Sequence, residues 1–170
     1  RGNDGERALL HGVYPCLGDD RWIALSVYNE QQWRAFVEVL GPLPAGRDWN
    51  DAAVRTEFRG DLESALCEIT RTRDSRVMMQ ALQARGVAAG MVQNARDMID
   101  HDPQLAHRGH WVRLRHPEMG LSVYNAPPMR FSDTPAQLSR PAPLLGQHPR
   151  EICRDLLAVG DEDFARMEAE

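Results

Sequence analysis

The sequence contains no lysine, although it carries 20 basic side chains, all of them arginine. Without a side-chain amine the chain has no lysine Schiff base, no pyridoxal-phosphate anchor and no Walker A lysine. Arginine stays charged and pairs well with carboxylates and phosphates, so anion binding remains open. We attribute the missing lysines to a compositional bias rather than to a function.

Cysteine is scarce, and long apolar runs are absent. The three cysteines are odd in number and too far apart for a CxxC motif, which disfavours a disulfide framework and fits a reducing cytoplasm. The longest aliphatic stretch, 87–92, is far shorter than the roughly 20 residues of a membrane span. A net charge of −5 also argues against broad contact with nucleic acid or anionic lipid. We therefore expect a cytoplasmic protein that binds neither nucleic acid nor membrane.

Familiar catalytic motifs are missing too, since the chain has neither a GxSxG elbow nor a GxGxxG loop. Cys67 and Cys153 fit the flank of a core better than the role of a nucleophile. The cluster of Arg71, Arg73 and Arg76 is interpreted as a solvated face. Four histidines lie close together in the sequence, but they fall on several different expected elements, and their spacing does not suit a metal site. We interpret them as turn and surface residues. These histidines are His101, His107, His110 and His116.

The hydrophobic pattern predicts an α+β fold. Alternating apolar residues predict a hairpin with strands over 11–16 and 21–28. Asn29 is a suitable N-cap for a helix that ends at Gly41, and the four tryptophans are assigned to a core or an interface. The later elements are helices over 51–58, 61–69 and 75–85, a strand over 87–93, a short helix over 94–100, a helical turn from 102, strands over 110–115 and 121–126, and helices over 148–157 and 161–168.

This order of elements indicates a small two-layer domain over residues 7–131, in which antiparallel hairpins carry helices on one side. Residues 1–6 form an incoming loop that contains glycine. Pro135, Pro141 and Pro143 indicate an extended arm, which together with the C-terminal helices makes up residues 132–170. Because the sequence begins with arginine rather than methionine, we expect it to be a portion of a longer protein.

Short segments, in order along most of the chain, resemble the family III CoA-transferases, the CaiB/BaiF group. Each segment is weak alone, and their order and coverage carry the resemblance. The segments are RGN at 1–3, HGVYPC at 11–16, GDDRWIAL at 18–25, QWR at 32–34, VLG at 39–41, Leu82, GV at 86–87, AG at 89–90, DPQL at 102–105, RG at 108–109, HPEMG at 116–120, PPMRFSDTP at 127–135 and PAPLLGQH at 141–148.

The resemblance implies an intact enzyme that moves CoA between an acyl-CoA and a carboxylic acid through an aspartyl-CoA thioester. Its catalytic aspartate would lie in an N-terminal large domain outside this chain, so no catalytic residue and no metal ligand is assigned here, and the chain alone is expected to be inactive. CoA or acyl-CoA would be a substrate, not a tightly bound cofactor. Gly2, Asn3 and Gly5 correspond to a lid over the active site in some relatives.

The resemblance also implies partners and leaves alternatives. The expected partners are the large domain, on which residues 132–170 would pack, acyl-CoA, and a second copy in an interlocked homodimer. One alternative is the C-terminal part of a 2-methylacyl-CoA racemase, whose catalytic histidine and aspartate would also lie outside this chain. The segments at 1–3 and 18–22 favour the transferase. The other alternative is a non-catalytic interaction module.

Overall fold

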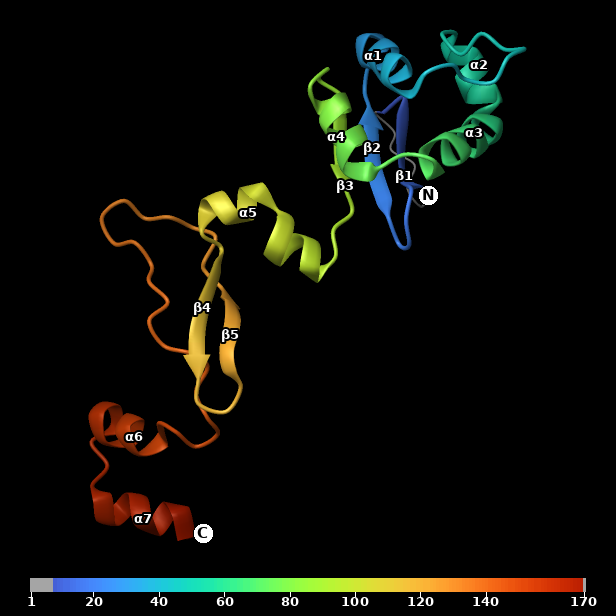
Figure 1. Ribbon diagram of the computed structural model, residues 1–170. Helices are drawn as coiled ribbons and strands as arrows, with labels where there is room; N and C mark the ends of the chain where they lie inside the picture. Colours follow the sequence, from blue (N-terminus) through green and yellow to red (C-terminus); the bar gives the residue numbers. More distant parts are fainter. Residues whose placement is uncertain (1–7, 170) are drawn as a thin grey trace. The chain divides into compact units, whose positions relative to one another are not determined.

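The computed structural model describes residues 8–169 and is drawn in Figure 1. Contacts within the chain divide it into two compact units, Arg1–Asn94 and Ala95–Glu170. The sequence analysis placed a boundary after residue 131, because residues 132–170 are expected to pack on a large domain outside this chain. This boundary stays a prediction.

The first unit is built on a three-stranded antiparallel sheet in the order β1-β2-β3. The strands and helices lie close to the ranges that the hydrophobic pattern predicts. The elements of this unit are β1 (Leu10–Pro15), β2 (Trp22–Val27), α1 (Glu30–Leu40), α2 (Ala52–Glu57), α3 (Arg59–Arg71), α4 (Ser75–Gln83) and β3 (Ala88–Met91).

The sheet has one buried face and one open face. In β2, the side chains of Ile23, Leu25 and Val27 are buried in the core, and α1, α3 and α4 all contact the sheet. Because successive side chains of a strand point to opposite faces, Trp22 lies on the open face together with Val13 of β1. The expected two-layer α+β arrangement, with helices on one side, is confirmed.

The ends of α1 follow the expected capping chemistry. The Asn29 carboxamide oxygen accepts a hydrogen bond from the Gln32 backbone N–H at 2.9 Å, and Trp33, Phe36 and Leu40 form the buried stripe. The helix stops at Gly41, whose φ of 77° is a conformation that favours glycine. The predicted helix therefore has the expected start, end and buried face.

A buried arginine fastens the loop between α1 and α2. Arg55 donates hydrogen bonds to the carbonyl oxygens of Trp49 and Asn50 at 2.9 and 3.0 Å and forms an ion pair with Glu30. Its guanidinium lies 4.6 Å from the centre of the Trp33 ring. The buried guanidinium of Arg55 is thus paired with an acid and hydrogen-bonded to backbone carbonyl groups, which offsets the cost of removing its charge from water.

The second unit contains a two-stranded antiparallel hairpin and several helices, separated by an extended segment. The short helix expected over 94–100 is a π-helical turn over Asp97–His101 instead. In the extended segment, Ala142 donates its backbone N–H to the Tyr124 hydroxyl at 3.4 Å, and Arg108 donates to the Pro128 carbonyl oxygen at 2.6 Å. The elements of this unit are η1 (Asp97–His101), α5 (Pro103–Arg108), β4 (Trp111–His116), β5 (Gly120–Asn125), α6 (Pro149–Leu157) and α7 (Asp161–Ala169).

Replacing Gly12 by alanine should destabilise the first unit. A Cβ atom at this position would lie 2.7 Å from the Tyr14 hydroxyl oxygen and 2.9 Å from Cζ, and the Tyr14 ring is buried in the core. The ring would have to move, so we expect Gly12→Ala to lower the free energy of unfolding by about 1–3 kcal/mol. Urea denaturation followed by circular dichroism measures this change.

Gly60→Ala is the matched control. Gly60 lies in α3, and no atom lies within 4 Å of the Cβ that alanine would add there. Alanine favours the helix by about 0.5–1 kcal/mol over glycine, so this variant should be as stable as the parent chain or more stable. Equal stability of the Gly12→Ala chain and the parent would contradict the packing described for Tyr14.

Candidate functional site

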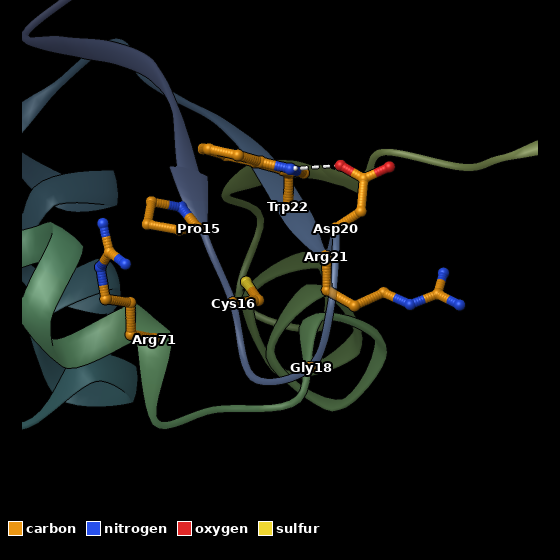
Figure 2. A pocket seen from close by; sticks show the side chains of 7 residues that line it. All are labelled: Pro15, Cys16, Gly18, Asp20, Arg21, Trp22 and Arg71. Atoms are coloured by element: carbon orange, nitrogen blue, oxygen red, sulfur yellow. Dashed lines mark hydrogen bonds between the residues drawn. The ribbon is translucent and has the colours of Figure 1, made fainter.

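A pocket of about 350 Å³ opens at the turn between β1 and β2. Figure 2 shows that the end of α3 contributes one side chain, Arg71, while the hairpin contributes the rest. The lining residues are Pro15, Cys16, Gly18, Asp20, Arg21, Trp22 and Arg71. The pocket thus combines an exposed aromatic ring with two guanidinium groups and one carboxylate.

The turn holds the Trp22 side chain in place. The Trp22 indole N–H donates to a carboxylate oxygen of Asp20 at 3.0 Å, a bond that Figure 2 shows as a dashed line. Asp20 has a φ of 49°, a left-handed conformation that aspartate tolerates better than most residues do. Cys16 donates its backbone N–H to the Arg21 carbonyl oxygen at 2.7 Å, which closes the turn. The backbone therefore fixes the positions of both polar partners.

Cys16 is a poor candidate for a nucleophile although it lines this pocket. Burial raises the pKa of its thiol from the ordinary value of 9.0 to about 11, and the nearby Asp74 carboxylate contributes in the same direction. The thiolate is the reactive form, so this thiol is almost entirely unreactive near neutral pH. The side chain belongs to the hydrophobic core.

The three arginines that the sequence places together have different roles. Arg71 is exposed and lines the pocket. Arg73 is half-buried and donates hydrogen bonds to the carbonyl oxygens of Val39 and Leu40 at the end of α1. Arg76 makes a further interaction within the protein. The interpretation as one solvated face is therefore wrong for Arg73, because this side chain satisfies carbonyl groups that the end of α1 leaves unpaired.

The histidines do not form a metal site. The ring Nδ1 of His116 accepts the backbone N–H groups of Glu118 and Met119 at 3.2 and 3.1 Å, so His116 stabilises the turn of the second hairpin. His110 packs edge-to-face against Trp111, with ring centres 4.7 Å apart. Across residues 8–169, no three His, Cys, Asp or Glu side chains are arranged to hold a metal ion.

The structure brings together one serine and one histidine that the sequence analysis did not single out. His11 and Ser26 are directly opposite on β1 and β2, and His11 Nδ1 lies 2.7 Å from Ser26 Oγ on the open face of the sheet. A catalytic triad would also need a carboxylate that orients the imidazole. No such acid is bonded to His11 within residues 8–169, so the described residues do not form a triad.

One expected feature of the sequence is not tested by this geometry. Gly2, Asn3 and Gly5, the candidate lid residues, lie outside the described residues, and their role stays a prediction. Within the part of the chain that the structure describes, none of the helices has the length and apolar character that crossing a membrane requires.

Comparison with protein families matches the model for CoA-transferase family III over residues 1–149. This range covers most of the chain. The chain belongs to CoA-transferase family III. The resemblance that the ordered segments carried is thereby confirmed.

Relatives of this chain are named as CoA-transferases. The chain is 35% identical over 161 residues to the probable CoA-transferase Rv1866 of Mycobacterium tuberculosis, a match that covers 93% of this chain and 20% of the relative. It is 34% identical over 167 residues to the succinyl-CoA:(R)-benzylsuccinate CoA-transferase subunit BbsE of Thauera aromatica, covering 89% of this chain and 39% of the relative. The chain therefore spans well under half the length of these relatives.

Solved structures support the fold of family III. A CAIB/BAIF family protein from Brucella suis superposes with a TM-score of 0.72 at 22% identity, covering 91% of this chain and 39% of that one. Rv3272 from M. tuberculosis gives a TM-score of 0.61 at 19% identity, covering 84% of this chain and 40% of that one. The α+β arrangement is thus that of family III proteins.

The raised pKa of Cys16 predicts a loss of stability at alkaline pH. The folded chain keeps this thiol protonated up to about pH 11, whereas the unfolded thiol loses its proton from about pH 9. The contribution of the thiol to folding is therefore complete below pH 9 and is lost as the pH rises toward 11. Between pH 8 and 10, the parent chain should lose more stability than Cys16→Ala, as measured by urea denaturation.

Thiol labelling checks the same assignment independently. At pH 8, iodoacetamide should modify Cys153, which is half-buried, faster than Cys16 in variants that keep only one cysteine. Equal labelling rates, or parallel stability curves for the parent and Cys16→Ala, would contradict a buried and protonated Cys16.

Proposed function

We propose that this chain is the C-terminal part of an enzyme that transfers CoA from an acyl-CoA to a carboxylic acid, with the catalytic aspartate on polypeptide outside residues 1–170. Membership of family III over residues 1–149 carries the proposal. The names of the relatives, and the small share of their length that the chain spans, add support.

The proposed reaction proceeds through covalent intermediates on the aspartate. The aspartate carboxylate attacks the thioester carbonyl, which gives a mixed anhydride and releases CoA as a thiolate. The thiolate then attacks the aspartyl carbonyl, so that aspartyl-CoA forms and the donor acid leaves. The acceptor acid repeats both steps in reverse, and the products are a new acyl-CoA and the free aspartate. CoA is a substrate throughout, and the site must keep water from the intermediates.

The chemistry of the described residues agrees with a catalytic aspartate elsewhere. Asp20 is the carboxylate at the pocket, and its oxygen accepts the indole N–H of Trp22. Cys16 is protonated, and within residues 8–169 no acid is bonded to the pair of His11 and Ser26. The residues of this chain would therefore bind and shield the reactants instead of reacting with them.

We further propose that residues 132–170 pack on the large domain. Helix α6 exposes apolar side chains that a separate chain leaves in contact with water, with Ile152 49%, Leu156 77% and Leu157 66% exposed. Burying such a surface against another domain would stabilise both parts. The lid role of Gly2, Asn3 and Gly5, and an interlocked homodimer, are further parts of the same proposal.

The isolated 170-residue chain should not transfer CoA. Incubation with succinyl-CoA and candidate acceptor acids, followed by mass spectrometry of the CoA products, should give no new acyl-CoA. The longer protein that carries this chain should catalyse transfer and, with the donor alone, should accumulate an aspartyl thioester that hydroxylamine cleaves. Turnover by the isolated chain would contradict the placement of the aspartate, and absence of transfer by the longer protein with any tested acid pair would contradict the function.

Leu156→Gln should destabilise the longer protein and leave the isolated chain unchanged. Leu156 would be buried only where the large domain is present, and burial of a leucine is worth about 2 kcal/mol. Thermal unfolding of both proteins measures the difference. Leu121→Gln is the matched control, because Leu121 is similarly exposed at 62% but lies outside residues 132–170. An equal effect of Leu156→Gln and Leu121→Gln on the longer protein would contradict the packing of α6.

A further inference from the structure

We propose that His116 makes the second hairpin sensitive to pH, with the β4–β5 turn closed while the imidazole is neutral and released when the imidazole is protonated. The inference rests on the geometry of this turn and is independent of the proposed function. It adds a conformational switch to a histidine that otherwise only stabilises a turn.

The turn requires a neutral imidazole. His116 Nδ1 accepts the backbone N–H groups of Glu118 and Met119 in the turn that joins β4 and β5 (Figure 1). Backbone N–H groups only donate, so Nδ1 must offer its lone pair, and the proton of the neutral ring lies on Nε2. A second proton would have to bind at Nδ1, where it would face two other N–H groups. Protonation therefore abolishes both hydrogen bonds and replaces them with repulsion between donors.

These two hydrogen bonds matter because little else closes the turn. The structure records no other acceptor for the N–H groups of Glu118 and Met119 among residues 8–169. Within the described part of the chain, the sheet that this turn connects has two strands, and a two-stranded hairpin is marginally stable in water. The loss of both bonds is thus large compared with the stability that the hairpin has of its own.

The surroundings of His116 do not favour an imidazolium. Only 6% of the residue is exposed, and no ion pair is recorded for it among residues 8–169. A buried charge without a partner is costly. Burial and the two backbone donors therefore act in the same direction, and both favour the neutral ring.

The charged groups nearest to His116 along the chain point away from it or are exposed. The element that packs against β4 is β5, and its residues on the His116 face include Ser122 and Tyr124, which carry hydroxyl groups rather than charged ones. Arg115 points to the opposite face of β4, because side chains alternate along a strand. Glu118 lies in the turn and is exposed, so water and salt screen its attraction for a protonated ring. The Glu118 carboxylate is the group that opposes the switch.

The switch would control an apolar hairpin tip. Met119 and Leu121 are 63% and 62% exposed, and the turn sets their positions. Farther along β5, the Tyr124 hydroxyl accepts the Ala142 backbone N–H of the extended segment at 3.4 Å. Release of the turn would therefore change the surface at the tip and loosen the strand that this segment contacts.

Hydrogen exchange of the 170-residue chain, followed by NMR between pH 8 and pH 5, tests the proposal. Histidine takes up a proton in this range, and the released turn binds one proton more than the closed turn, so the closed turn loses stability as the pH falls. The readout is the protection factor, which divides the intrinsic exchange rate by the observed rate and so removes the direct effect of pH on exchange. The protection factors of the Glu118 and Met119 amides should fall about 10-fold or more, because both hydrogen bonds are lost. At pH 8, the ring nitrogen resonances of His116 should show the proton on Nε2.

Two substitutions of His116 separate its titration from its packing. Asparagine accepts N–H groups two and three positions later in turns that begin Asn-Pro, and it does not titrate. His116→Asn should therefore keep the protection seen at pH 8 and lose its dependence on pH. His116→Phe keeps a ring but has no acceptor, so protection of both amides should be low at every pH. His107→Asn, which removes an exposed histidine of α5, is the control and should behave like the parent chain.

Glu118→Gln provides a test of the charge. Without the carboxylate the protonated ring loses an attractive neighbour, so the fall in protection should move to lower pH. Constant protection of both amides between pH 8 and pH 5, low protection at pH 8, a fall that His116→Asn retains, or a proton on Nδ1 at pH 8 would overturn the inference. None of these outcomes bears on CoA transfer by the longer protein, so the proposed function stands or fails separately.

Discussion

The buried face of β2 determines what the first unit can expose. The side chains of Ile23, Leu25 and Val27 must face the helices, since they supply the centre of the core. The alternation along a strand then sends Trp22 to the other face, however costly its contact with water is. The exposed tryptophan is thus a direct result of the burial that stabilises the sheet.

Local patterns predicted most of the fold. The N-cap at Asn29, the glycine at the end of α1 and the two hairpins involve residues close together in sequence, so the pattern alone specifies them. The π-helical turn over Asp97–His101 was not predicted, because its hydrophobic pattern does not differ from that of a short α-helix. The family was predicted from the order of short sequence segments. The hydrophobic pattern alone would not have identified it.

The candidate site was less predictable because it depends on contacts between distant residues. Arg71 reaches the pocket from the end of α3, and Arg73 reaches carbonyl groups more than 30 positions earlier. No local spacing distinguishes these two arginines, although one faces the pocket and the other supports a helix end. The outward position of Trp22 was visible in the alternation of β2, and this signal could have identified the aromatic wall of the pocket.

Arg73 joins three parts of the first unit. Its carbonyl oxygen accepts the backbone N–H of Leu17 at 2.8 Å, and its side chain fastens the last carbonyl groups of α1. A displacement of the hairpin turn would therefore pull on the far end of that helix through a single amino acid. Lysine, with a single ammonium on a flexible stem, would lack the fork that reaches both carbonyl groups at once. The connection between the hairpin turn and α1 therefore requires arginine at position 73, and a lysine of the same charge would not replace it.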